Sequence, residues 1–195
     1  INFGINVFKK FNFRDVCTFI VLIMIIDGKK EAAVLRDGIK KEIESIKLKT
    51  NKIPGLTVIL IGDFAPSQIY VRNKEKNSKE VGINSEVVKY PKEVTEQEVL
   101  KKIETLNNDN NVSGILVQLP LPTQINKEKI INAIDPKKDV DGFHPMNVGN
   151  LSSGYKATVP CTPLGCLLLI KKIEPSLSGK HAVIIGRSNL NGKPM

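Results

Sequence analysis

The sequence is poor in the residues that build metal centres, disulfide frameworks and base-stacking surfaces. Its 195 residues include no Trp, 2 His and 3 Cys, and aromatic residues make up 5% of the chain. Cys17, Cys161 and Cys166 form no C-x-x-C pair, so we expect free thiols in a reducing compartment, the cytoplasm. His144 and His181 lie far apart in the sequence, which argues against a structural metal site.

Long hydrophobic runs are also scarce. The longest covers residues 16–26, whereas a membrane span needs roughly 20 apolar residues, so we expect no membrane association. Lys9, Lys10 and Arg14 resemble the charged start of a signal peptide, but no A-x-A-like cleavage site follows the run. Two interpretations stay open: a signal or anchor, or a true start at Met24 that leaves residues 1–23 as an extension outside the fold.

Positive charge exceeds negative charge. The formal net charge of +9 at pH 7 favours an anionic partner, or it reflects a lysine-rich solvated surface. Without an Arg-rich tract, zinc-finger spacing or Trp, we expect no nucleic-acid partner. Small anionic ligands such as dinucleotide phosphates suit the charge equally well.

Apolar strand patterns alternate with helical patterns along the chain. Strands are predicted over residues 56–61, 83–90, 114–119 and 181–185. Helices are predicted over residues 30–49, 65–80 and 127–134, from the capping box at 95–98, and over 161–173. Leu35, Ile39, Ile43 and Ile46 form one apolar stripe on the first helix. This order predicts an α/β fold with a mainly parallel sheet and a boundary between two lobes near residues 150–160.

Tyr70 and Lys74 stand at i and i+4 in a predicted helix, which places both side chains on one face. A ring beside an amine is a plausible acid/base pair, because desolvation favours the neutral amine. The alternative is a surface lysine next to a half-buried tyrosine. The Y-x-x-x-K pattern also occurs in short-chain dehydrogenases, but no glycine-rich nucleotide turn precedes Tyr70, and we reject that assignment.

Two further segments carry polar groups that suit ligand binding. Gln118 lies at the carboxyl end of a predicted strand, where open α/β sheets bind ligands, although it can also merely cap the strand. Asp139 and Asp141 share one loop with Gly142. A carboxylate there can bind paired N–H donors of a ligand, or both aspartates can belong to a solvated Asx-type turn.

A glycine-bearing turn at residues 186–192 follows the predicted strand 181–185. A turn between a strand and a helix is a phosphate-binding context, because helix N-terminal amides favour anions. The spacing is not G-x-G-x-x-G, so the pattern alone is equally consistent with an ordinary βα turn. Arg187 favours NADP over NAD, since a guanidinium can pair with the 2′-phosphate.

Six segments together resemble the bifunctional methylenetetrahydrofolate dehydrogenase/methenyltetrahydrofolate cyclohydrolase family. They are IIDGK (25–29), YVRNKEK (70–76), GILVQLPLP (114–122), DVDGFHPMNVGNL (139–151), PCTPLG (160–165) and GRSNLNGKPM (186–195). The resemblance implies a three-layer α/β folate-binding domain at residues 24–155 and the start of a Rossmann NADP-binding domain at 156–195. It implies NADP-dependent oxidation of 5,10-methylenetetrahydrofolate, hydrolysis of the methenyl product to 10-formyltetrahydrofolate, and a homodimer.

The resemblance also assigns residues to both ligands. The folate site takes Tyr70, Lys74, Val117, Gln118, Leu119 and Asp141, and the NADP site takes Gly186, Arg187 and Ser188. Within the folate site, Lys74 is implied as the general acid/base and Gln118 as its positioning partner. Tyr70 is implied to pack against the folate, and Asp141 to anchor the pterin ring.

Two features depart from the family pattern. Asn191 stands where the family usually has an apolar residue in the nucleotide turn. The chain ends at Met195, before the family's late glycine-rich loop, so we expect little dehydrogenase activity from the chain as given. The alternative function is a non-catalytic folate-binding or basic interaction module.

Overall fold

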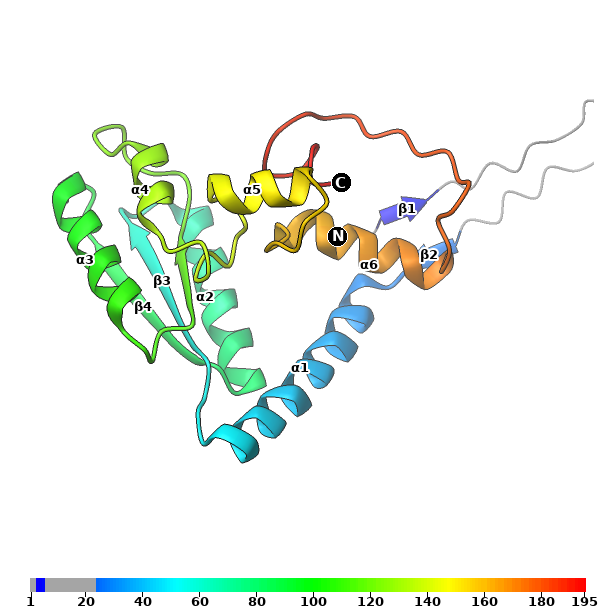
Figure 1. Ribbon diagram of the computed structural model, residues 1–195, viewed down its shortest axis with the longest axis horizontal. Helices are drawn as coiled ribbons and strands as arrows, with labels where there is room; N and C mark the ends of the chain where they lie inside the picture. The colour runs from blue at the N-terminus through cyan, green and yellow to red at the C-terminus, as the bar shows by residue number, and fades with distance from the viewer. Residues whose placement is uncertain (1–2, 6–23) are drawn as a thin grey trace, which may run out of the picture.

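The computed structural model describes residues 3–5 and 24–195, and Figure 1 shows how their helices and strands are arranged. The strands are β1 (Phe3–Ile5), β2 (Met24–Ile26), β3 (Gly55–Ile61), β4 (Asn84–Tyr90) and β5 (Gly114–Val117). The helices are α1 (Gly28–Thr50), α2 (Ala65–Val81), α3 (Glu96–Asn108), α4 (Lys127–Ala133), α5 (Pro145–Ser152) and α6 (Cys161–Ile173).

The central sheet has β3 between β4 and β5, and all three strands run parallel. β3 pairs with β4 along its whole length, and residues 56–59 of β3 pair with β5. Parallel neighbours need crossover connections, which α2 and α3 provide. The predicted α/β fold with a mainly parallel sheet is confirmed.

Two apolar clusters cover the two faces of this sheet. Along β3, Ile59 and Ile61 point to one face while Val58 and Leu60 point to the other, because successive strand side chains alternate. The helical members of the first cluster are Val99, Ile103, Leu106 and Ile130. The second cluster contains Val71 of α2. α3 and α4 therefore cover one face and α2 the other, which gives three layers (Figure 1).

Local signals set several helix ends where the sequence predicts them. α3 begins after Thr95, whose hydroxyl accepts the N–H of Glu98 at 3.3 Å while the Glu98 carboxylate accepts the N–H of Thr95 at 3.0 Å. α2 ends at Gly82, whose φ of +90° is a left-handed conformation that favours glycine. The helix predicted over residues 161–173 coincides with α6.

α1 is longer than the predicted helix over residues 30–49, and its apolar stripe is only partly covered. Ile43 is buried, whereas Leu35 and Ile46 are 50% and 42% exposed. α1 packs against α2, and α1 also lies beside α6 (Figure 1). Residues of α1 and α6 line a groove of about 400 Å³. Helical periodicity identified the stripe, but the neighbouring elements decide how much of it is buried.

The sequence pattern predicts no helix over α5, because this short segment contains Gly, Asn and Ser, which have low helix propensity. Its start is stabilised by the surrounding chain. The Nδ1 atom of His144 accepts the N–H of Met146 at 3.1 Å, and Pro145 occupies the first turn. The buried Asn147 then ties the helix to the preceding loop.

The strand predicted over residues 181–185 is wrong. The segment forms no strand, and Ile185 is 100% exposed. A strand exists only where a neighbour supplies hydrogen-bond partners, and the sheet of β4, β3 and β5 does not include this segment. The apolar pattern of the segment gives no information about such a partner.

Most of residues 1–23 lie outside the described residues. Phe3–Ile5 are described, and they pair antiparallel with Met24–Ile26. The interpretations of residues 1–23 as a signal, an anchor or an extension therefore stay predictions. Within the described ranges, no helix has both the length and the apolar character needed to cross a membrane.

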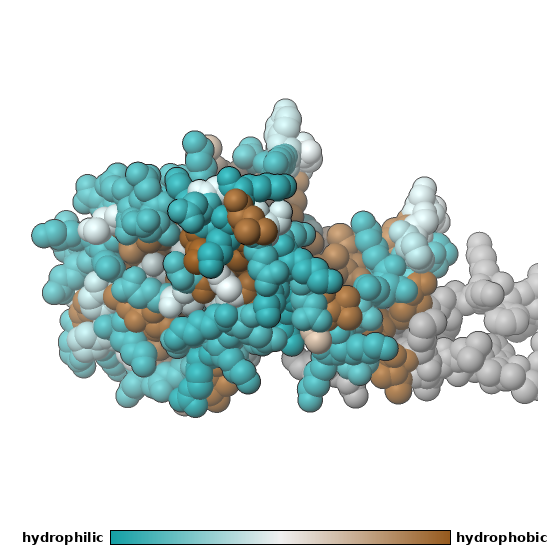
Figure 2. Space-filling view, turned by 90° about the horizontal axis from the view of Figure 1, so that it is seen from below, coloured by the Kyte–Doolittle hydropathy of each residue, from teal (hydrophilic) through white to brown (hydrophobic). Residues whose placement is uncertain are grey.

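The surface is rich in hydrophilic side chains. Figure 2 shows one face on which hydrophilic residues predominate and apolar residues appear in patches. Exposed ion pairs such as Lys79 with Glu75, at 2.7 Å, are typical of it. Pairs of this kind contribute about 0–1 kcal/mol each to the free energy of unfolding, so they add little to the stability of the fold.

The segment after α4 is anchored to both α3 and β5. The ammonium group of Lys138 donates to three carbonyls at the end of α3, each at 2.8 Å; these belong to Leu106, Asn107 and Asp109. Terminal helix carbonyls lack intrahelical partners, and a cation beside them is favourable. Ile115 of β5 donates its N–H to the Lys138 carbonyl at 2.7 Å and bridges Asp139 in parallel. The backbone of Asp139 is therefore held in a fixed position beside β5.

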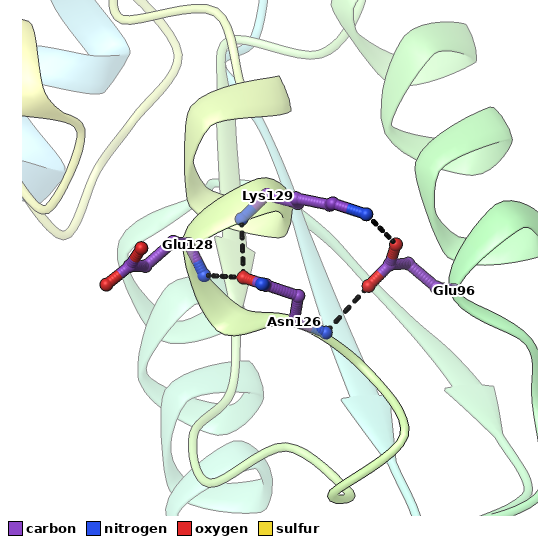
Figure 3. A network of polar contacts seen from close by, with 4 residues as sticks. All are labelled: Glu96, Asn126, Glu128 and Lys129. Atoms are coloured by element: carbon purple, nitrogen blue, oxygen red, sulfur yellow. Dashed lines mark hydrogen bonds and ion pairs between the residues drawn. The ribbon is translucent and has the colours of Figure 1, made fainter.

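A polar network joins the N-termini of α3 and α4 at the carboxyl edge of the sheet (Figure 3). The Glu96 carboxylate accepts the N–H of Asn126 at 2.7 Å and the ammonium of Lys129 at 3.0 Å. The Asn126 side-chain oxygen in turn accepts the N–H groups of Glu128 and Lys129 at 2.9 and 3.1 Å. One carboxylate thus connects the two helices that cover one face of the sheet.

This network predicts an acid-sensitive contribution to stability. The N–H of Asn126 and then the ammonium of Lys129 hold the pKa of Glu96 below its ordinary value. Such a carboxyl stabilises the fold above its unfolded pKa, and the contribution is lost as the pH falls through the lower folded pKa. Glu96→Gln is expected to lower the melting temperature at pH 7, and the difference from the wild type is expected to narrow below about pH 4.

Thermal unfolding followed by circular dichroism between pH 7 and pH 3 measures this effect. Glu93→Gln is the matched control, because Glu93 is exposed and has no side-chain hydrogen bond in the described part of the chain. A melting-temperature difference for Glu96→Gln that stays constant over this pH range would contradict the role given to the charge.

Candidate active site

α2 places Tyr70 and Lys74 one turn apart, and both side chains line a cavity of about 780 Å³. Lys74 is half-buried and Tyr70 is 61% exposed. Near the start of α2, the buried hydroxyl of Ser67 donates to the Leu119 carbonyl at 3.3 Å. This bond connects α2 to the loop that follows β5, so residues on both elements keep a defined separation.

Gln118 follows β5 directly, and its backbone N–H still donates to Ile59 of β3 at 2.9 Å. Its side-chain nitrogen donates to the Leu119 carbonyl at 2.8 Å, while its side-chain oxygen accepts from the ammonium group of Lys74 at 3.1 Å. Because an amide donates only through its nitrogen, the bond to Leu119 fixes which end faces the lysine. Gln118 therefore orients Lys74 without adding charge.

The loop between α4 and α5 gives the two aspartates of the DVDG segment different surroundings. Asp139 is 3% exposed and accepts hydrogen bonds from the N–H groups of Gly142 and His144 and from the Asn147 side chain. Asp141 instead lines the cavity with Lys74. The sequence left both carboxylates as ligand candidates; of the two, only Asp141 is among the cavity-lining residues.

Gly142 turns the chain immediately after Asp141, with a φ of +69° that favours glycine. A Cβ atom at this position would lie 2.6 Å from the Thr158 carbonyl oxygen and 3.1 Å from Pro160. The segment before α6 thus packs directly against the loop. Glycine is required here for two reasons, the backbone conformation and the close approach of Thr158.

The charges in the cavity influence one another. Burial raises the pKa of Asp141, the nearby Lys74 ammonium opposes that rise, and Asp139 adds to it. Desolvation and the Asp141 carboxylate likewise raise the pKa of the Cys161 thiol, again against the effect of Lys74. Lys74, Asp141 and Cys161 thus form one electrostatic group contributed by α2, the DVDG loop and the first residue of α6.

The structure brings most of the predicted folate-site residues to this cavity. Those that line it are Tyr70, Lys74, Gln118, Leu119 and Asp141. Val117 is different: it is 6% exposed, belongs to the core cluster on the α3 and α4 face, and is not among the lining residues. The alternation of a strand explains this, because Val117 and Leu116 must point to opposite faces.

Sequence reasoning missed several residues that line the cavity. Phe143 and Cys161 contribute to its wall, and so do Leu190 and Asn191 from the glycine-bearing turn. A signal for Cys161 was present, since it opens α6 directly after a turn-rich segment. In the described residues, no group of three or more His, Cys, Asp or Glu side chains is placed to hold a metal ion.

The three residues predicted to contact a nucleotide lie beside the cavity rather than in its wall. Gly186, Arg187 and Ser188 are exposed. The Ser188 hydroxyl accepts the N–H of Asn191 at 3.1 Å, and the Ser188 carbonyl accepts the N–H of Lys193 at 3.0 Å. The turn is therefore organised by its own serine, and it brings Asn191 into the wall of the cavity.

Two family models match the chain. Residues 26–141 match the model described as tetrahydrofolate dehydrogenase/cyclohydrolase, catalytic domain. Residues 160–195 match the model described as tetrahydrofolate dehydrogenase/cyclohydrolase, NAD(P)-binding domain. The first match contains Tyr70, Lys74, Gln118 and Asp141, and the second contains Arg187.

Curated relatives are similar over most of the chain. It is 69% identical over 172 residues to the bifunctional protein FolD of Pelagibacter ubique and 53% identical over 171 residues to that of Streptococcus pyogenes. Each alignment covers 88% of this chain, but the chain spans only 61% and 60% of the length of these two relatives.

Solved structures show the same fold. The bifunctional FolD dehydrogenase/cyclohydrolase of Campylobacter jejuni matches with a TM-score of 0.84 at 47% identity, over 87% of this chain and 60% of that one. The Trypanosoma brucei FolD, solved with NADP cofactor and an inhibitor, matches with a TM-score of 0.80 at 31% identity, over 87% and 58%.

Proposed function

Because this chain belongs to the tetrahydrofolate dehydrogenase/cyclohydrolase family, we propose that it acts on one-carbon folates at the cavity of Lys74. The proposed reactions are NADP-dependent oxidation of 5,10-methylenetetrahydrofolate and hydrolysis of the 5,10-methenyl product to 10-formyltetrahydrofolate. The observation that carries the proposal is the 3.1 Å bond from Lys74 to Gln118 in a cavity that Asp141 also lines. An amine, an orienting amide and a carboxylate suit a cationic, nitrogen-rich ligand.

Lys74 is the proposed general acid/base of the hydrolytic step. The methenyl carbon bridges two ring nitrogens and carries positive charge, so water adds to it readily once a base removes the water proton. The Lys74 amine accepts that proton as the C–O bond forms. The proton then passes to the departing nitrogen as its C–N bond breaks, and the hydroxyl proton of the adduct is released to solvent, which leaves the formyl group on the other nitrogen.

Gln118 and Tyr70 are proposed to place Lys74 and the ligand. A charged acceptor in place of Gln118 would favour the ammonium form of the lysine, and an ammonium cannot take a proton from water. The neutral amide of Gln118 holds the amine in position and leaves it free to act as a base. The exposed ring of Tyr70 offers an apolar surface on which a folate ring can pack.

Asp141 is the proposed anchor of the pterin ring, which presents an N–H and an amino group side by side. A carboxylate accepts such paired donors with both oxygens. Leu119 lines the same cavity and adds apolar contact, while Val117 supports the site from the core. The assignment of these residues to the folate follows from the family resemblance and the shared cavity.

We propose that the turn at residues 186–192 contacts the dinucleotide. A Cβ on Gly192 would lie 2.3 Å from the carbonyl carbon of Gly186, so the turn closes only with glycine there. Arg187 and Ser188 are exposed and supply a guanidinium and a hydroxyl. Together with Gly186, they would hold the phosphates or ribose of NADP. When bound, NADP supplies the nicotinamide ring that takes up a hydride.

The organisation that we propose follows from the same family. Residues 24–155 form the folate-binding domain and residues 156–195 begin the NADP-binding domain. The family models, at residues 26–141 and 160–195, support this division. The free Cys161 and Cys166 agree with a cytoplasmic location, and we propose a homodimer by analogy with the family.

Turnover of 5,10-methenyltetrahydrofolate by the purified chain tests the proposal. We expect the methenyl absorbance to disappear faster than in buffer alone, with 10-formyltetrahydrofolate as the product, and a folate analogue to compete. Binding of the analogue without turnover would indicate a non-catalytic folate-binding module. Binding of DNA that weakens steeply with salt, with no folate binding, would instead indicate a basic interaction module.

A further inference from the structure

Asp139 is a buried carboxylate to which the proposed mechanism gives no role. It is 3% exposed and is not among the residues that line the cavity. Burying a carboxylate is costly unless hydrogen bonds compensate for lost water. The contacts of Asp139 therefore indicate what it does for the loop.

Three N–H groups supply that compensation. One oxygen of Asp139 accepts the backbone N–H of Gly142 at 3.0 Å. The other accepts the backbone N–H of His144 at 2.8 Å and the side-chain N–H of Asn147 at 2.9 Å. Asn147 also donates to the Pro136 carbonyl at 2.9 Å, which ties α5 to the segment before Asp139.

These bonds confine Asp141 between two fixed points. On one side, Asp139 forms a parallel bridge with Ile115 of β5. On the other, the N–H of Gly142 is bonded to the Asp139 side chain, and the Thr158 carbonyl closes the space beside Gly142. The chain between Asp139 and Gly142 is too short to move independently of these anchors, so the direction of Asp141 depends on the Asp139 carboxylate.

Asp139 also contributes to the charge that Asp141 experiences. The groups that face Asp141 are Lys74 from α2, Asp139 from its own loop and the Cys161 thiol from α6. Lys74 favours the ionised form of Asp141, whereas burial and Asp139 oppose it and raise its pKa. Removing the Asp139 charge should therefore lower the pH at which Asp141 titrates.

We propose that Asp139 is a positioning residue for the folate site: its carboxylate holds the DVDG loop so that Asp141 faces the ligand. The inference rests on the proposed function, because it assumes that Asp141 binds the substrate. This positioning role differs from a purely structural role in a measurable way, because it makes substrate affinity and the pH dependence of that affinity depend on Asp139.

Methenyltetrahydrofolate hydrolysis by the Asp139→Asn variant tests the proposal. An asparagine places an NH₂ group against at least one of the N–H donors, so we expect KM to rise about tenfold or more while kcat changes less than about threefold. The acidic limb of the profile of KM against pH should also move to lower pH. Asn147→Ala removes one donor but keeps the charge, so it should raise KM less and leave that limb in place.

Asn107→Ala is the control for lost stability, because the hydrogen bonds of the Asn107 side chain in the described residues go to the backbone of Ala133 and Asp135, and Asn107 does not line the cavity. It should lower the melting temperature without changing KM.

If Asp141→Asn raises KM while both Asp139→Asn and Asn147→Ala leave KM and its pH profile unchanged, the positioning role is overturned and the proposed function stands. If the wild type neither binds nor hydrolyses the folate, both fail. Where Asp139→Asn does not fold, the Asn147→Ala result decides.

Discussion

Replacing Lys74 by methionine is expected to lower kcat for hydrolysis of 5,10-methenyltetrahydrofolate by about 10²- to 10⁴-fold, the usual contribution of a general acid/base. Methionine keeps an unbranched apolar stem, so α2 should retain its packing while the amine is lost. In the described residues the Lys74 ammonium bonds to Gln118 alone, so little else changes. KM should change much less than kcat, because Asp141 and Tyr70 still contact the substrate.

The matched control is Lys79→Met on the same helix. Lys79 pairs with Glu75 at an exposed position and does not line the cavity, so its loss should leave kcat within about twofold. Stopped-flow measurement of the methenyl absorbance gives kcat for each variant, and circular dichroism checks the fold. A fall of less than tenfold for Lys74→Met would remove Lys74 from the chemical step.

Gln118→Glu is expected to have the second largest effect. It replaces the amide oxygen that lies 3.1 Å from the Lys74 ammonium by a carboxylate. An opposite charge within about 4 Å favours the charged form of an amine. The ammonium form of Lys74 then persists to higher pH, so kcat at pH 7 should fall about 10- to 10³-fold and the rate should recover as the pH rises.

The pH profile distinguishes this effect from simple damage to the site. Gln97→Glu introduces the same charge at an exposed position in the first turn of α3, outside the cavity, and should leave the profile unchanged. A Gln118→Glu variant whose rate falls equally at every pH would contradict the proposed role. Such a result would mean that the substitution displaces the Lys74 side chain rather than stabilising its ammonium form.

The two predictions concern residues from different elements, and only the tertiary structure brings these residues together. Tyr70 and Lys74 were paired from sequence, because the i and i+4 spacing of a helix is a local property. Gln118 was placed at a strand end for an equally local reason. Their 3.1 Å contact depends on how α2 packs across β3 and β5, which no single segment encodes.

Sequence patterns determined the elements whose signals lie within a few residues. The predicted buried runs correspond to β3 and β5. The helix α3 begins after the capping-box residue Thr95, and α2 ends before Gly82. The family resemblance likewise rested on contiguous motifs. Backbone conformation and capping are short-range effects, so a linear pattern carries enough information to predict them.

Tertiary structure decided everything that needed a partner from elsewhere in the chain. Residues 181–185 have strand composition, yet no neighbouring strand in the described part of the chain pairs with them. Asp139 and Asp141 look alike in sequence, but the N–H groups of Gly142, His144 and Asn147 surround only the first. Burial and hydrogen bonding are properties of a position in space, and they made one carboxylate part of the loop and left the other facing the cavity.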